Sequence, residues 1–552
     1  MTKYSSWPTT DQGKEVGGRL KVEVRHRFSS MTGLSQTDQR DAALCELLAG
    51  TSEVFNVKSY GAPGDGTDQT LAILSAIEAA ASYDTVIIGP GTYTIGTIAI
   101  TKPLRVVCWG ARITLSGDNA GFSVEGTVAW FRVEGGEITG DNTNRDADSS
   151  LVQIGWSFGN EAAADVADVS IAFVSIDQAN IGIRFAYGTG PSNPVERVRV
   201  LGCKVTGSVG TVGGTGYGLQ FTQAPGSSVI GGYIEGCGRH GLYFSEGENY
   251  NATGVHIENC GPDTGAIRGG VAISRSANVS VTACNIHDNK DVGLVIDVDA
   301  QGITPNTAEG VTVSGCTFSD NKFGDLVIGT SAPATDGVPK SVTFTGNTLV
   351  CLATTTSPIV IRAGNRIRIT NNNIDASKVT GTLRIVSLTA DDAATHTDDV
   401  TISRNSIEAL AGDTIGIQVA SSLCTGTQRL RFIDNDMQVA GNPEMEFLGT
   451  VTNTDLHYNG RDVQNLTGAG AVSIVHPITH IITTGADALT LADGHEDQRK
   501  SIVMQTDGGA GTLTPTSLGN GSTITFDDVG DSAELLFTNS AWHFMGGTAT
   551  LA

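Results

Sequence analysis

The sequence has 552 residues, of which 70 are glycine and 17% are charged, and its 58 acidic and 34 basic residues give a formal net charge of −24. This length exceeds what one globular core usually organises, so we expect either several domains or a stack of repeats. The negative charge argues against electrostatic binding of nucleic acid or of an anionic membrane surface. No apolar run approaches the ~18 residues of a membrane span. The first residues lack the apolar segment of a signal peptide, so we expect synthesis in a cytoplasm.

Residues 1–50 form an arm that precedes the main pattern of the chain. The arm holds too few apolar residues for a core of its own, so we expect it to be ordered by packing on something else. It either attaches the chain to another protein or caps the body of the molecule. The sequence favours neither reading.

The next segment predicts a strand, a capped helix and a further strand. Phe55-Asn-Val57-Lys-Ser-Tyr60-Gly61-Ala-Pro-Gly64-Asp65-Gly66-Thr67-Asp68 leads into an apolar stripe of Leu71, Leu74 and Ile77. Thr67 or Asp68 could cap that helix. Thr85-Val-Ile-Ile88 and the turn Gly89–Tyr93 follow. This order of elements would close the open end of a stack of parallel strands, whose edge would otherwise recruit other chains.

Residues 53–100 resemble the entry motif of the pectate-lyase superfamily as it occurs in bacteriophage tailspike and tail-fibre proteins. Across the later repeats the resemblance weakens to the pattern alone. It implies a right-handed parallel β-helix, commonly a homotrimer in phage tailspikes, that binds and often degrades host cell-surface polysaccharide. It also implies a place in the virion tail, with residues 1–50 contacting tail or adaptor proteins.

A repeat of two short strands joined by a sharp bend recurs along about half of the chain. β-Branched residues alternate in each copy, and a Cys or Asn lies near the bend. Six copies are Val279–Ile286, Val311–Phe318, Val342–Leu349, Ile367–Ile374, Val400–Ile407 and Leu430–Met437. We expect the Asn side chains to bond to the backbone or to the equivalent Asn one coil away, and the cysteines to be reduced and buried in the same columns.

A third strand follows the bend in most copies, as in Gly218-Leu-Gln-Phe221 and Gly241-Leu-Tyr-Phe244. We therefore predict an all-β fold, a right-handed parallel β-helix of three-strand coils over residues 51–460 with an N-terminal capping helix. Residues 461–552 change to short strands between Gly- and Asp-rich turns and predict a β-sandwich-like module. Residues 485–547 resemble a C-terminal module of phage fibre and spike proteins, which implies trimer assembly or a distal tip.

Acidic residues on the third-strand wall are the candidates for catalysis. Hydrolysis of a glycosidic bond needs two carboxylates roughly 5–10 Å apart, and equivalent positions on neighbouring coils provide such spacing. Aligning the third strands places Glu246, Arg275 and Asp297 on one wall, with Asp299 at its edge. The acids could be a catalytic pair with Arg275 steering an anionic sugar, or a surface ion-pair ladder. If the protein is an enzyme, a glycoside hydrolase is favoured over a lyase.

Aromatic residues near the same wall are the candidates for sugar binding. Tyr187, Tyr217 and Tyr243 could serve as platforms. Gly238-Arg239-His240-Gly241 is similar to the Gly-His-Gly element of polygalacturonases, but the other elements of that active site are absent, so Arg239 and His240 are retained only as substrate-binding candidates. No histidine pair or acidic loop has the spacing of a metal site, and no metal or cofactor is predicted.

Two functions therefore stay open at the level of sequence. The first is a phage tailspike that binds host polysaccharide and depolymerises it. The second is a non-enzymatic virion appendage that uses the same coils as a rigid spacer or adhesin.

Overall fold

The computed structural model falls into two compact units, Met1–Pro262 and Asp263–Ala552. The residues that the structure describes are 19–21, 53–117, 121–140, 153–159, 165–185, 195–208, 216–261, 268–297, 308–329, 338–379, 383–389, 397–409, 414–420, 423, 429–439, 445–448, 456–459, 463–474, 476–494 and 496–552. Most of the predicted arm of residues 1–50 lies outside them. No helix in these ranges is long and apolar enough to cross a membrane.

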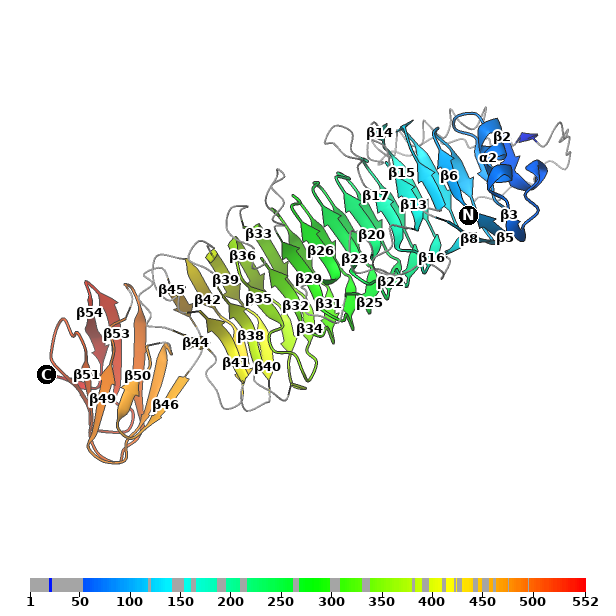
Figure 1. The fold of residues 1–552 in the computed structure, drawn as a ribbon. Coiled ribbons are helices and arrows are strands. Elements are labelled where there is room, and N and C mark those ends of the chain that lie inside the picture. The colour runs from blue at the N-terminus through cyan, green and yellow to red at the C-terminus, as the bar shows by residue number, and fades with distance from the viewer. Residues whose placement is uncertain are drawn as a thin grey trace, which may run out of the picture. The chain divides into compact units, whose positions relative to one another are not determined.

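In the first unit, each coil contributes one strand to each of three parallel sheets (Figure 1). Sheet 1 contains β2 (Glu53–Asn56), β4 (Thr85–Ile87), β7 (Arg105–Val107), β11 (Phe131–Glu134), β15 (Val169–Ala172), β18 (Arg199–Leu201), β21 (Ser228–Ile230) and β24 (Asn251–Thr253). Sheet 2 contains β3 (Asp65–Asp68), β5 (Gly91–Ile95), β8 (Ala111–Leu115), β12 (Glu137–Thr139), β16 (Ser175–Asp177), β19 (Lys204–Thr206), β22 (Tyr233–Glu235) and β25 (His256–Glu258). Sheet 3 contains β6 (Thr97–Ile100), β9 (Gly121–Val124), β13 (Ile154–Phe158), β17 (Ile181–Phe185), β20 (Tyr217–Thr222) and β23 (His240–Ser245). In addition, β1 (Arg19–Lys21) pairs antiparallel with β2, and β10 (Thr127–Val128) pairs with β14 (Asp165–Val166).

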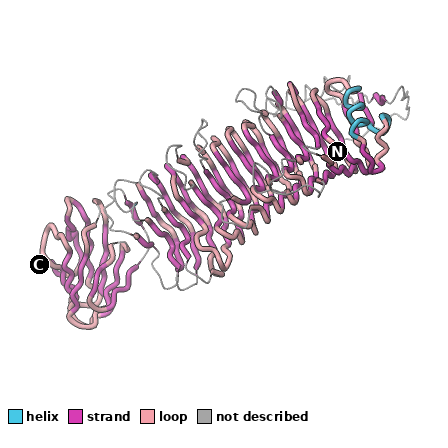
Figure 2. The backbone as a smooth tube through the Cα atoms, in the orientation of Figure 1, coloured by secondary structure: helices cyan, strands magenta, loops and turns pink. Residues whose placement is uncertain are grey.

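The second unit has coils of the same three kinds of strand. Its sheet 1 strands are β27 (Ser280–Thr282), β30 (Thr312–Ser314), β33 (Lys340–Thr345), β36 (Gly364–Thr370), β39 (Thr397–Ser403), β42 (Leu430–Ile433) and β45 (Leu456–Asn459). Its sheet 2 strands are β28 (Asn285–His287), β31 (Thr317–Ser319), β34 (Thr348–Val350), β37 (Asn373–Asp375), β40 (Ser406–Ala409) and β43 (Asp436–Val439). Its sheet 3 strands are β26 (Gly269–Ser274), β29 (Val292–Asp297), β32 (Gly324–Ile328), β35 (Ile359–Ile361), β38 (Leu383–Leu388), β41 (Thr414–Val419) and β44 (Met445–Phe447). Figure 2 shows this nearly all-strand composition.

The predicted Asn column is confirmed in the second unit, at the bends between sheets 1 and 2. Asn372 Oδ1 accepts from the backbone N of Asn347 at 2.9 Å, and its Nδ2 donates to Asn405 Oδ1 at 2.9 Å. Asn405 repeats the pattern with Asn435. Cys316 takes the same place, with its backbone N donating to Asn347 Oδ1 at 2.9 Å. At the bends of Cys316, Asn347, Asn372 and Asn405, the buried backbone N–H is therefore paired by an Asn side chain of the next coil.

The cysteines are free and buried at all seven described positions, as the sequence predicts. Burial raises the pKa of Cys203 to about 11 and that of Cys108 to about 12. The thiolate is the reactive form of cysteine, so these residues are packing groups and not nucleophiles.

The capping helix is present, but of the predicted apolar stripe of Leu71, Leu74 and Ile77 only Ile77 is buried. Helix α2 (Thr70–Ala79) follows the 3₁₀ turn η1 (Val57–Tyr60) and packs on β2 and β6. The N-cap of the helix is Gln69 and not Thr67 or Asp68; Asp68 accepts from the hydroxyl and the backbone N of Thr70, which lowers the pKa of Asp68. With this start, the buried face consists of Ile73, Ala76 and Ile77, while Leu71 is 79% exposed.

The interior of the first unit is a column of aromatic rings from sheet 3. The ring centroids of Phe158 and Phe185 are 5.0 Å apart, those of Phe185 and Phe221 are 4.7 Å apart, and those of Phe221 and Phe244 are 5.2 Å apart. All four side chains are buried. Offset stacking of this kind adds to the free energy gained by burying the rings.

The glycine that opens the third strand is required by close packing, because the coil is narrow there. A Cβ at Gly218 would lie 2.6 Å from Gly241 O and 2.6 Å from Ile234 Cγ2. We expect Gly218→Ala to lower the free energy of unfolding by about 1–3 kcal/mol through overpacking. Thermal unfolding would check this, with Gly485→Ala as the control because a Cβ at Gly485 meets nothing within 4 Å. An unchanged midpoint for Gly218→Ala would contradict the packing argument.

The C-terminal strands form two five-stranded sheets with one apolar core. One sheet contains β46 (Val463–Thr467), β48 (Ile478–Ile482), β50 (Arg499–Thr506), β53 (Ser532–Thr538) and β54 (Ala541–Gly547). The other contains β47 (Gly470–Val472), β49 (Asp487–Leu491), β51 (Gly511–Pro515), β52 (Ile524–Phe526) and β55 (Thr550–Leu551). The first three strands of each sheet are parallel, unlike those of an immunoglobulin-type sandwich, and only the last strands pair antiparallel.

Candidate functional site

The outer face of sheet 3 in the first unit carries two rows of side chains set by strand register. Ile181 of β17 is paired with Tyr217 of β20, which is paired with His240 of β23. Three residues further along the same strands, Arg184, Gln220 and Tyr243 form the second row. Neighbouring parallel strands are about 4.8 Å apart, so each row brings its side chains into contact distance. We call Arg184, Tyr217, Gln220, Arg239, His240 and Tyr243 the sheet 3 cluster.

Four of the predicted substrate-binding residues gather in this cluster. The ring centroids of Tyr217 and Tyr243 are 5.1 Å apart, and those of His240 and Tyr243 are 5.5 Å apart with an interplanar angle of 8°. The Arg239 guanidinium carbon lies 5.1 Å from the centroid of the Tyr217 ring, within cation–π range. The ring stacking and the cation–π contact therefore stabilise the positions of these side chains relative to one another.

Burial divides the cluster into a base and an outer row. Tyr217 and His240 are buried, while Arg184, Gln220 and Tyr243 are half-buried. Burial also lowers the pKa of the Arg184 guanidinium below its ordinary value. Two buried polar atoms, Gln220 Oε1 and Arg239 Nε, find no hydrogen-bond partner in the part of the chain that the structure describes. Buried polar atoms are nearly always paired in folded proteins, so these two are candidates to meet a ligand.

Glu246, the first predicted catalytic acid, follows directly after β23. It has a positive φ of 57°, and its Oε2 accepts from Gln223 Nε2 at 2.9 Å. The carboxylate is thus tied to the preceding coil of the first unit. Gln223 is uncharged, so this contact is no ion pair, and the catalytic role of Glu246 stays a prediction.

The other predicted acids and the predicted steering arginine belong to the second unit or lie outside the described residues. Asp297 ends β29 opposite Ser274, as the repeat alignment predicts, and is half-buried. Arg275 is only 4% exposed, with a φ of 46°, so its guanidinium is held inside the fold. Its role in steering an anionic sugar stays a prediction. Asp299 and Tyr187 lie outside the described residues.

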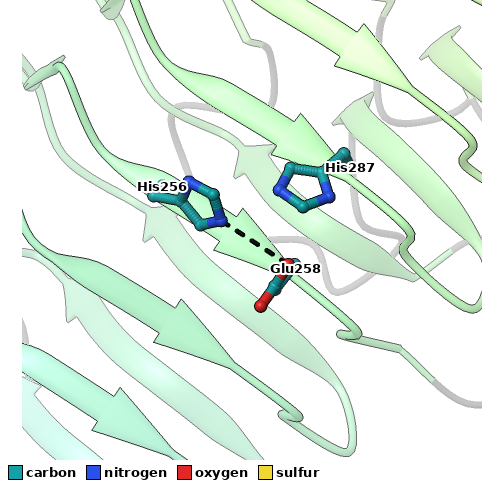
Figure 3. Close-up of side chains that lie close together, drawn as sticks. All are labelled: His256, Glu258 and His287. Atoms are coloured by element: carbon teal, nitrogen blue, oxygen red, sulfur yellow. Dashed lines mark ion pairs between the residues drawn. The ribbon is translucent and has the colours of Figure 1, made fainter.

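A second constellation, which sequence reasoning missed, lies on sheet 2 of the first unit. The Tyr233 hydroxyl donates to Glu235 Oε2 at 3.0 Å and also to Glu258, so the pKa of Tyr233 is raised above its ordinary value, first by the bond to Glu258. The His256 ring stacks on Tyr233 at 4.9 Å, and its Nε2 lies 3.5 Å from Glu258 Oε2 (Figure 3). Lys204 Nζ lies 5.7 Å from the Tyr233 ring centroid.

His256 and Glu258 carry metal-ligating groups, because an imidazole nitrogen and a carboxylate oxygen can both bind a metal ion. Structural and catalytic zinc sites use three or four protein ligands. The expectation that the chain has no metal site stays a prediction.

Arg184 and Gln220 are the members of the sheet 3 cluster that sequence reasoning missed. Each occupies the single polar position of a third-strand repeat, which resembles ordinary filling of an outer strand face. The signal that could have found them was the register itself, because the repeat alignment already placed both in line with Tyr243.

Comparison with known proteins identifies the fold. A family model described as right handed beta helix region matches residues 175–349. No curated protein matches the sequence.

Among solved structures, the A-module of mannuronan C-5 epimerase AlgE6 from Azotobacter vinelandii is 17% identical, with a TM-score of 0.45, and covers 72% of this chain and 98% of that chain. ORF18 of Geobacillus virus E2 is 16% identical, with a TM-score of 0.36, and covers 93% of this chain and 78% of that chain. The polygalacturonase of Erwinia carotovora ssp. carotovora is 12% identical, with a TM-score of 0.36, and covers 70% of this chain and 94% of that chain. Together with the three parallel sheets, the family match establishes that the chain folds as a right-handed parallel β-helix.

Proposed function

We propose that this protein is a bacteriophage tailspike or tail-fibre protein that binds host cell-surface polysaccharide. The observation that carries the binding function is the sheet 3 cluster, which combines stacked aromatic rings with guanidinium and amide groups. Sugars present a C–H face to rings and hydroxyl groups to such polar atoms, and binding sites generally combine apolar walls with a few oriented polar groups. The phage assignment rests on the resemblance of residues 53–100 to the tailspike entry motif.

The proposal includes a homotrimer, attachment to the virion tail through residues 1–50, and synthesis in the host cytoplasm. Closed symmetric assembly is common among homo-oligomers, and a β-helix presents flat walls that threefold packing can cover. Analytical ultracentrifugation would test the trimer, because a particle of one chain would sediment near 57.2 kDa. A monomer would remove the trimer from the proposal while leaving the binding function standing.

Variants of the outer row test the binding function. We expect Tyr243→Ala to weaken binding of the full chain to host capsular polysaccharide or lipopolysaccharide at least about tenfold, because truncating an aromatic anchor typically costs 2 kcal/mol or more. Surface plasmon resonance would measure the affinity. Arg199→Ala, which removes an exposed arginine from sheet 1, serves as the control. Equal affinities for Tyr243→Ala and the parent protein would contradict the assignment of the site.

Incubating the protein with the same host polysaccharide and looking for released oligosaccharides separates adhesion from depolymerisation. Release of oligosaccharides would extend the function to glycoside hydrolysis, and a Glu246→Gln, Asp297→Asn double variant would then be expected to stop it. Binding without release would identify a non-enzymatic spacer or adhesin.

A further inference from the structure

The first unit carries a groove of about 410 Å³ along the bends between sheets 1 and 2, away from the sheet 3 cluster. Its lining includes two aromatic rings and a set of polar side chains, namely Trp109, Phe173, Thr92, Arg112, Glu137 and Ser175. Trp109 lies in the bend between β7 and β8, and Phe173 lies in the bend between β15 and β16. The groove is thus made of consecutive coils of one rigid stack.

Two large apolar rings in this groove are half exposed and in contact. Trp109 is 51% exposed and Phe173 is 53% exposed. Their ring centroids are 6.0 Å apart at an interplanar angle of 34°. Large apolar side chains that cluster at a hollowed surface mark binding sites more often than single exposed residues do. The exposed rings of Trp109 and Phe173 therefore indicate a binding surface for a ligand with an apolar face.

The backbone around the rings is arranged to hold them. A Cβ at Gly135 would lie 2.5 Å from Trp109 Cδ2, and a Cβ at Gly202 would lie 2.9 Å from Phe173 Cδ1, so each ring rests against a glycine of the next coil. Phe173 itself has a φ of 57°, a region that bulky residues rarely adopt. Gly135, Gly202, Ala283 and Arg404 also have positive φ directly after their sheet 1 strands, so this conformation belongs to the bend, and Phe173 places a bulky ring there.

A row of polar side chains follows the rings across four neighbouring strands. Thr92 is in register with Arg112, Arg112 with Glu137, and Glu137 with Ser175. Four strands span roughly 14 Å, the length of a few sugar units. Arg112 Nε lies 3.3 Å from Glu137 Oε2, and both side chains are mostly exposed, so the two charges balance each other while their outer atoms stay open to solvent.

We propose that this groove is a second saccharide-binding site, specific for a neutral glycan. A pyranose ring offers a C–H face to Trp109 and Phe173 and hydroxyl groups to the row from Thr92 to Ser175. The balanced ion pair gives no net charge to attract an anionic sugar, and the net charge of −24 repels polyanions. The site is separate from the sheet 3 cluster and does not depend on whether that cluster binds.

The test applies the full chain to an array of immobilised bacterial O-antigen and capsular oligosaccharides, sorted into neutral and acidic members. We expect binding to neutral members that falls at least tenfold in both Trp109→Ala and Phe173→Gly. Phe173→Gly relieves the positive φ, so it should fold at least as well as the parent. Phe323→Ala is the control, since it removes a phenylalanine that is 42% exposed outside the groove.

Three results would overturn the proposal. The first is an array with no bound neutral glycan, and the second is unchanged binding in both groove variants. The third is a change of sedimentation mass in Phe173→Gly, which would show that a second copy of the chain covers the rings. Loss of binding in Tyr243→Ala alone would support the sheet 3 cluster and count against the groove, so the two sites are tested separately.

Discussion

Replacing Asn372 by alanine is expected to lower the free energy of unfolding of the second unit by about 2–6 kcal/mol. The side chain accepts from Asn347 N at 2.9 Å and donates to Phe344 O at 3.0 Å and to Asn405 Oδ1 at 2.9 Å. Its residue is 2% exposed, so water does not replace these bonds in the folded state. Each buried group left without a partner costs about 1–3 kcal/mol, and alanine leaves two, Asn347 N and Phe344 O, because Asn405 Oδ1 still accepts from the backbone N of residue 372.

Hydrogen exchange read by mass spectrometry measures this effect locally, because a protein of several units does not unfold in one step. We expect the amides of β33 and β36 to exchange faster in Asn372→Ala, while those of β50 and β53 stay unchanged. Asn372→Cys is the matched control. Cys316 fills the same column, where its Sγ accepts from Cys284 N at 3.4 Å and contacts Val281 O at 3.5 Å, so cysteine should lose less than alanine. Equal protection in all three proteins would show that the column is not stabilising.

The bends were predictable because each one must satisfy the same buried backbone groups, so the same residue types return at the same place. Asn347, Asn372 and Asn405 gave that column from the sequence alone, and the third-strand register of Ser274 with Asp297 followed from it. The buried face of α2 did not follow. The apolar spacing also fitted a stripe through Leu71, and which face is buried depends on how the helix packs on β2 and β6.

The groove was hidden from the sequence because its residues do not keep the repeat length. Trp109, Gly135 and Phe173 occupy equivalent bends although 26 and then 38 residues separate them, so no fixed period aligns them. The burial of Arg275 was hidden for a related reason. Strand register aligns Arg275 with its neighbours along the sheet but does not say how exposed its side chain is.

Asp325 is expected to make the stability of the second unit depend on pH. Its strand register with Gly293 puts it where most third strands have glycine, and the carboxyl group points inward, with Oδ1 accepting from Asn321 Nδ2 at 2.8 Å. It is 2% exposed, and no described residue pairs with Oδ2. Burial raises the pKa of Asp325 from 3.8 to about 7.

A carboxyl group whose pKa is higher in the folded than in the unfolded state favours folding when protonated. The stability that protonated Asp325 contributes to the folded state is fully present below pH 3.8 and is lost as the pH rises to about 7. The whole loss is about 4 kcal/mol, since one pKa unit corresponds to about 1.4 kcal/mol.

Asp325→Asn keeps the shape and removes the ionisation, so it should stabilise the protein by about 2 kcal/mol more at pH 8.5 than at pH 5.5. Unfolding in urea, followed at both pH values, measures the difference. Asp436→Asn provides a control at an exposed carboxyl group of β43 in the same unit. The same gain at both pH values would mean that Asp325 is not held protonated by the fold.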